Sequence, residues 1–140
     1  MKFYTARQCR FHAVRLVPGQ DLKQELQSLT LAAGIQAGFV ISAVGSLTRV
    51  ALRLANRKDC TQMDGHFEIL SLNGTLSPHG VHLHLSVSDG AGNVTGGHLM
   101  EGCEVFTTVE LVAGEAVDLI FQRKTDERTT HKELVIRRAK

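Results

Sequence analysis

The stretch from Val81 to His98, VHLHLSVSDGAGNVTGGH, alternates strictly between apolar and polar residues before it reaches a glycine-rich turn. Side chains two positions apart on a β-strand point to the same face. The apolar positions are Val81, Leu83, Leu85 and Val87. His82 and His84 fall between them, on the opposite face. The stretch therefore predicts a strand with one face toward a core and a second, polar face that carries two histidines.

The second half of the stretch predicts a hairpin. Asp89-Gly90 and Gly92-Asn93 are turn-forming pairs. Gly96-Gly97 allows two backbones to approach closely just before His98. We expect the chain to reverse at this turn and to return His98 beside the face that carries the other two histidines.

Three histidines on one face of the predicted hairpin indicate a metal site. Residues two apart on a strand lie roughly 7 Å apart at Cα and project in parallel, so that two imidazoles can reach one ion. A third imidazole completes a ligand set that zinc uses with its fourth position open. We therefore predict that His82, His84 and His98 bind a divalent metal, with zinc as the expected ion. Histidine pairs are also common on plain polar strand surfaces, and that alternative stays open.

The remaining sequence predicts a sheet and one helix. A strand over residues 11–17 ends at Pro18-Gly19. From Asp21 to Gly34, leucines at helical spacing predict an amphipathic helix with Gly34 as its stop. Further strands follow, with breaks expected at Gly45-Ser46 and at the turn pair Asn73-Gly74. The predicted fold is α+β, mainly antiparallel sheet with one principal α-helix near the N-terminus.

Composition narrows the class of protein. The 140 residues suit one domain, and 16 basic against 14 acidic residues leave a net charge of +2, without a concentrated basic arm. The three cysteines form no CxxC pair, as expected of reduced thiols in the cytoplasm. Cys103 lies near His98 in sequence, but we expect a buried residue there and not a nucleophile. No apolar run reaches membrane-spanning length, which predicts a cytoplasmic protein without a membrane partner.

Residues 80–110, GVHLHLSVSDGAGNVTGGHLMEGCEVFTTVE, resemble the signature of the PPC domain, the plants and prokaryotes conserved domain. Supporting pieces are GFVISAVGSL at 38–47, GHFEILSLNGTLS at 65–77 and FQRKTDERTTHKELVI at 121–136. The resemblance implies a single PPC domain over residues 1–140, of the stand-alone prokaryotic type, and a compact homotrimer. Such members are generally labelled DNA-binding, a label inherited from plant relatives in which the domain follows AT-hooks.

Two features of the sequence depart from the plant pattern. The sequence holds no Arg-Gly-Arg-Pro core of an AT-hook, and this absence, together with the near-neutral charge, disfavours direct DNA binding. His66 stands where the plant pattern Gly-Arg-Phe-Glu-Ile-Leu has arginine, so the surface by which the plant domains bind other proteins differs here.

The fold that the resemblance implies is also similar to that of acetolactate decarboxylase, a zinc enzyme with a three-histidine site. By that analogy His82, His84 and His98 are the ligands, and Glu68, Glu101 or Glu104 is the general base. A trimer would also allow a neighbouring subunit to complete a ligand pocket. The expected pocket residues are Glu68, Arg53 and Glu110.

Three hypotheses follow. The favoured one is a homotrimer that binds a metal and a small ligand through the histidines. The alternatives are a zinc-dependent enzyme acting on a small carboxylate or ester, and a DNA-associated or regulatory interaction protein.

Overall fold

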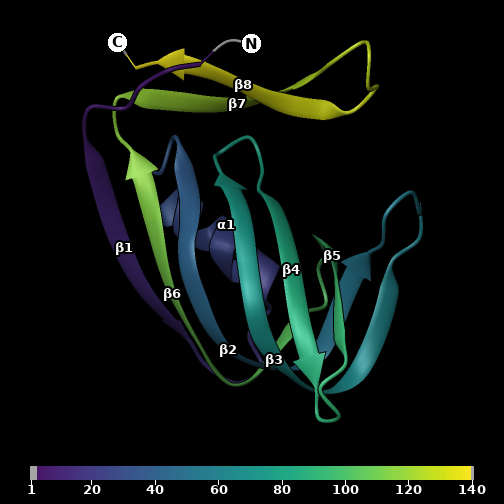
Figure 1. The fold of residues 1–140 in the computed structure, drawn as a ribbon. Coiled ribbons are helices and arrows are strands. Elements are labelled where there is room, and N and C mark those ends of the chain that lie inside the picture. The colour runs from purple at the N-terminus through teal and green to yellow at the C-terminus, as the bar shows by residue number, and fades with distance from the viewer. Residues whose placement is uncertain (1–2, 140) are drawn as a thin grey trace.

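The computed structural model describes residues 3–139, which form eight strands and one helix (Figure 1). In chain order these are β1 (Cys9–Leu16), α1 (Leu22–Ala32), β2 (Gly38–Arg53), β3 (Thr61–Leu76), β4 (His82–Asp89), β5 (Val94–Leu99), β6 (Glu104–Ala116), β7 (Leu119–Thr125) and β8 (Lys132–Arg138). All strand pairs are antiparallel. The predicted α+β class, with a single helix near the N-terminus, is confirmed.

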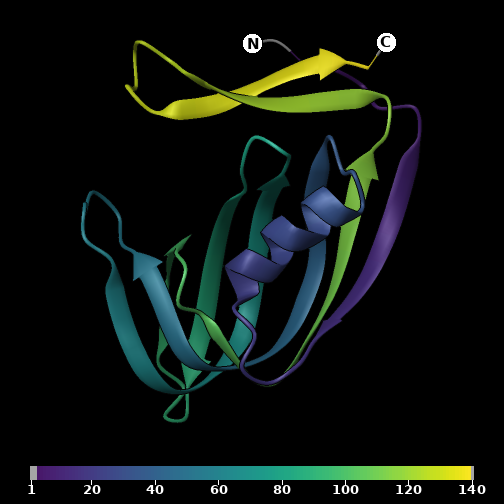
Figure 2. The same ribbon diagram turned by 180° about the vertical axis from the view of Figure 1, so that it is seen from behind.

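Six strands form one curved sheet in the order β1-β6-β2-β3-β4-β5. The sheet curls because β5 pairs with β4 and also with the last residues of β2, through Leu52–Leu99 and Arg53–His98. Helix α1 lies across the concave side of this sheet (Figure 2). The apolar side chains of β4 face the helix side, where Leu83, Leu85 and Val87 share one core with Leu22 and Leu26. The predicted alternation of β4 is thus confirmed, and its histidines lie on the face away from the helix.

Helix α1 begins where the sequence predicted. The Asp21 carboxylate caps it by accepting hydrogen bonds from the backbone N–H groups of Lys23 and Gln24. The same carboxylate accepts one from the N–H of Gly102, at 2.6 Å, which joins the helix start to the segment before β6. Gly34 follows the helix with φ +67°, as expected of a glycine stop. Within residues 3–139, no helix combines the length and the apolar character that crossing a membrane requires.

The expected breaks at Gly45-Ser46 and Asn73-Gly74 are wrong. β2 and β3 each run unbroken through 16 residues. Gly45 has φ +142° and Gly74 has φ +145°, conformations that other residues rarely adopt. Both glycines lie against the backbone of a paired strand, where a Cβ would collide with the carbonyl oxygen of Thr108 or of His82. These residues act as bends within strands, near register shifts in the case of Gly45, and not as turns.

Strands β7 and β8 form a separate hairpin that crosses one end of the main sheet (Figure 1). A small core fixes its base, where Leu119 and Phe121 pack with Ala37 and Ala116. The Phe121 N–H also donates to the carbonyl of Gln36. The hairpin therefore has a defined position over the sheet end at which β4 begins.

Candidate metal centre

Strand register brings the three predicted histidines together. The hairpin of β4 and β5 pairs His84 directly with His98, and His82 precedes His84 by two positions on the same strand face. Direct cross-strand partners place their side chains on the same face. The same rule places Arg53 of β2 beside His98, because these two residues are also partners. The predicted return of His98 through the glycine turn is confirmed.

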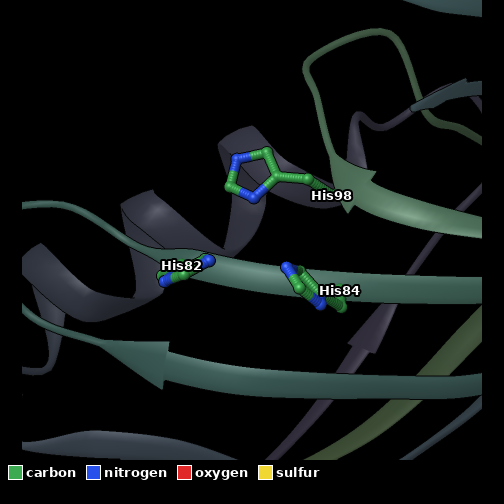
Figure 3. Close-up of side chains that lie close together, drawn as sticks. All are labelled: His82, His84 and His98. Atoms are coloured by element: carbon green, nitrogen blue, oxygen red, sulfur yellow. The ribbon is translucent and has the colours of Figure 1, made fainter. Parts of the chain in front are cut away.

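The three imidazoles gather around one space (Figure 3). Their ring centroids lie 5.1–5.7 Å apart, and one ring nitrogen of each lies within 4.8 Å of the others. In tetrahedral zinc coordination such nitrogens lie about 3.3 Å apart, somewhat closer than this. The Nδ1 atom of His98 is buried and has no hydrogen-bond partner among the described residues. A buried nitrogen without a protein partner is what a ligand site requires, so these side chains fit a metal ion.

Two of the imidazoles are held in their neutral form, which is the form that binds metal. Burial, and then the charge of Arg53, lowers the pKa of His98 to about 4. Burial, followed by the charge of Arg123, also lowers the pKa of His82. At neutral pH both rings therefore have a lone pair available.

Cavities adjoin the histidine cluster. The largest, of about 660 Å³, adjoins His84 and His98 and extends along residues 53–58 and the glycines of β5. A second, of about 350 Å³, lies between the main sheet and the β7–β8 hairpin and adjoins His82 and His98. Arg53 and His131 line both cavities. The imidazoles thus face space that a small molecule can enter.

The β7–β8 hairpin supplies site residues that the sequence did not predict. These residues are Arg123, His131, Lys132 and Glu133. Arg123 donates a hydrogen bond of 3.0 Å to the hydroxyl of Thr75, which is the cross-strand partner of His82. No local sequence signal indicates this contact, because Arg123 and Thr75 are 48 positions apart and belong to different sheets.

The other predicted pocket and base residues lie elsewhere in the chain. Glu68 pairs with Ser46 and Ser88, toward the far end of β4 from the histidines. Glu110 lies on β6 and lines a separate hollow with Val44. Glu101 is exposed, and Glu104 faces Arg49 at 3.7 Å. Within one chain, Arg53 is therefore the predicted pocket residue that lines the histidine cavities, and Glu133 is the carboxylate that lies there.

Cys103 is buried among the core residues of the helix side and does not face the histidines. Its sulfur accepts a hydrogen bond from the N–H of Ala51 and donates one to the carbonyl of Ala51. Burial raises the pKa of the thiol to about 11. The expectation of a structural cysteine is confirmed by this environment.

The family comparison agrees with this architecture. The model of the Plants and Prokaryotes Conserved (PCC) domain, the domain also abbreviated PPC, matches residues 4–117. This chain belongs to the PPC domain family. The matched range includes β1 to β6 and all three histidines, and it ends before the β7–β8 hairpin.

Curated proteins that match this chain in sequence are much longer than it. The bifunctional protein GlmU of a Synechococcus strain is 47% identical over 127 residues, which cover 91% of this chain and 20% of that protein. The AT-hook motif nuclear-localized protein 13 of Arabidopsis thaliana is 31% identical over 121 residues, which cover 78% of this chain and 25% of that protein. The chain thus spans about a fifth to a quarter of the length of these relatives.

Two solved structures have the same PPC fold. A hypothetical protein of Salmonella enterica is 43% identical, with a TM-score of 0.94 and coverage of 97% of this chain and 99% of that one. A protein of Archaeoglobus fulgidus, described as metal-containing, is 27% identical, with a TM-score of 0.73 and coverage of 96% and 99%.

Proposed function

We propose that this PPC domain is a zinc-binding protein, with His82, His84 and His98 as the three protein ligands and a small molecule as the natural occupant of the adjoining cavity. The observation that carries the proposal is the gathering of three ring nitrogens within 4.8 Å on one sheet face. The Archaeoglobus relative described as metal-containing supports it. We further propose that the protein acts in the cytoplasm, since its three cysteines are unpaired.

The geometry favours an open site over a closed structural one. Structural zinc sites almost always have four protein ligands, whereas sites that act on a molecule keep one position free. Among the described residues, no fourth histidine, cysteine or carboxylate joins the cluster. Zinc bound by three histidines supplies a Lewis-acid position that polarises a carbonyl or activates water. The chain itself contributes the cavity walls and the neutral imidazoles.

We also propose that the chain works as a homotrimer. Helix α1 covers the concave side of the sheet, while large apolar side chains on other positions of the sheet remain exposed. They are Phe11, Ile41, Val44, Leu70 and Phe106. Exposed large apolar side chains on several strands of one sheet favour a surface that another subunit covers. Val44 is the cross-strand partner of Glu110, so an interface here would carry Glu110 toward a neighbouring subunit, as the sequence prediction requires.

Metal analysis tests the zinc proposal. Protein purified without chelator should contain about one zinc ion per chain by inductively coupled plasma mass spectrometry. His84→Ala should lose most of that zinc, because two imidazoles hold zinc far less tightly than three. His66→Ala is the matched control, since the ring of His66 packs on Phe106 and is not part of the cluster. Full zinc content in His84→Ala would refute the assignment.

A zinc-dependent hydrolase or lyase acting on a small carboxylate or ester is the second candidate function. The position of Glu133 favours it, because this carboxylate lines two of the cavities that His82 also lines. A carboxylate at such a place can hold a proton transferred from a substrate or a water. If the candidate is right, Glu133→Gln should abolish turnover of a small ester while its zinc content stays at the wild-type level.

A further inference from the structure

Arg53 stands beside the histidine cluster without a partner. It is half-buried, lies across from His98 in the strand register, and lines the two largest cavities at the cluster. Within residues 3–139, its guanidinium group has neither a hydrogen bond nor an ion pair. A half-buried guanidinium group has lost part of its hydration, which costs free energy. Because no protein group pairs with Arg53, that desolvation cost is not offset by the protein, and an anionic ligand would offset it.

Arg123 faces the same space from the opposite element. Its Nη2 donates to the hydroxyl of Thr75 at 3.0 Å and its Nη1 donates to the carbonyl of Lys132 at 3.2 Å. Both acceptors are uncharged, so they orient the guanidinium group without forming an ion pair, and Glu133 is the acidic group whose charge reaches it. A guanidinium group has five N–H donors, and three therefore remain for a ligand. The group is already positioned before any ligand arrives, which lowers the entropy cost of binding.

The charges that line the histidine cavities are strongly one-sided. The cationic side chains are Arg53, Arg57, Lys58, Arg123 and Lys132, whereas Glu133 is the one carboxylate among the lining residues that the structure describes. One oxygen of Glu133 already accepts a hydrogen bond from the hydroxyl of Thr129, at 2.9 Å. A cleft lined by one sign of charge attracts ligands of the opposite sign. The excess is local, because the whole chain has a net charge of only +2.

We propose that Arg53 and Arg123 bind a small oxyanion, a carboxylate or phosphate group, between the main sheet and the β7–β8 hairpin. The proposal rests on the zinc-binding function for one feature only, namely that the bound molecule has a second oxygen facing the three histidines. Guanidinium groups suit this ligand class because their planar fork matches two oxygens of a carboxylate or phosphate. Cavities of about 350 and 660 Å³ accommodate a small molecule. The hairpin, which lies outside the matched family range, thereby becomes a determinant of what the site accepts.

Calorimetry with a matched pair of probes tests the proposal. Malonate, inorganic phosphate and neutral malonamide are titrated into the full chain loaded with zinc, and the zinc content of each sample is measured in parallel. We expect malonate or phosphate to bind at least about 10-fold more tightly than malonamide. Which of the two anions binds more tightly assigns the natural ligand to the carboxylates or to the phosphates.

Arginine variants locate the binding. Arg53→Gln and Arg123→Gln should each weaken binding of the preferred anion about 10-fold, with zinc content unchanged. Arg137→Gln is the matched control, because this arginine is exposed on the same hairpin and lines none of these cavities. Equal affinity for malonate and malonamide, or unchanged affinity in Arg53→Gln, would overturn the oxyanion proposal and leave the zinc proposal intact. If the protein binds no zinc, that result refutes the zinc proposal alone, and arginine-dependent anion binding by the metal-free chain would still support the oxyanion site.

Discussion

His84 and His98 are direct cross-strand partners on β4 and β5, with their ring centroids 5.7 Å apart. This relationship makes the candidate metal centre a product of strand register. A shift of one residue in the β4–β5 pairing would send His98 to the face occupied by the core. The register is well specified, since Leu83, Leu85 and Val87 on the alternate positions of β4 are all buried. The alternation of β4 thus places residues of the apolar core on one face of the strand and residues of the histidine cluster on the other.

Metal removal should destabilise the protein. A ligand at 100 times its dissociation constant adds about 2.7 kcal/mol to the free energy of unfolding. For a chain of this size that corresponds to a decrease in Tm of roughly 5–10 °C when a chelator is added, measured by differential scanning calorimetry. His98→Ala should show no chelator effect, because it lacks one of the three ligands. A chelator-dependent decrease in His98→Ala as large as in the wild type would contradict the assignment of that ligand.

Gly74 should be required for the position of His82. Gly74→Ala forces a Cβ against the carbonyl oxygen of His82 and demands φ +145° of an alanine. We expect the free energy of unfolding to decrease by at least about 1 kcal/mol and zinc content to decrease with it, measured by urea denaturation and metal analysis. Gly90→Ala is the control, because a Cβ there meets open space and the φ of Gly90 is not in the left-handed region. Wild-type stability in Gly74→Ala would show that β3 can move away from β4 at this point.

Cys103 should resist alkylation in the folded protein. Its thiol is buried, and burial raises its pKa to about 11, so almost no thiolate is present at neutral pH. Cys9 and Cys60 are exposed. Iodoacetamide at neutral pH should therefore modify these two thiols and leave Cys103 intact until a denaturant is added, as mass spectrometry of tryptic peptides can show. Rapid native labelling of Cys103 would contradict the buried environment.

The sequence predicted the histidine cluster because everything that creates it is local. The alternation of β4 places His82 and His84 on one face, and the glycine turn is short enough to return His98 beside them. The same local reasoning failed at Gly45 and Gly74, because a glycine that bends a strand and a glycine that ends one look alike in sequence. The two cases differ in whether the backbone of a paired strand lies against the glycine. Here the backbone of Thr108 lies against Gly45 and that of His82 against Gly74, and such tertiary contacts cannot be read from the local sequence. Arg123 was missed for a related reason, since its place depends on how a separate hairpin docks on the sheet.

The exposed apolar surface of the sheet should hold the proposed trimer together. Val44 is 58% exposed on β2, and if the proposed interface covers it, a charge at this position would be buried without a partner. We expect Val44→Glu to convert a species of three chains into a monomer, measured by light scattering coupled to size-exclusion chromatography. Val94→Glu is the matched control, because Val94 is 63% exposed but begins β5, next to the hairpin turn. A wild-type protein with the mass of one chain would refute the trimer itself. A trimeric Val44→Glu would place the interface on a different surface, and Glu110, the partner of Val44 in the strand register, would then have no route to a neighbouring site.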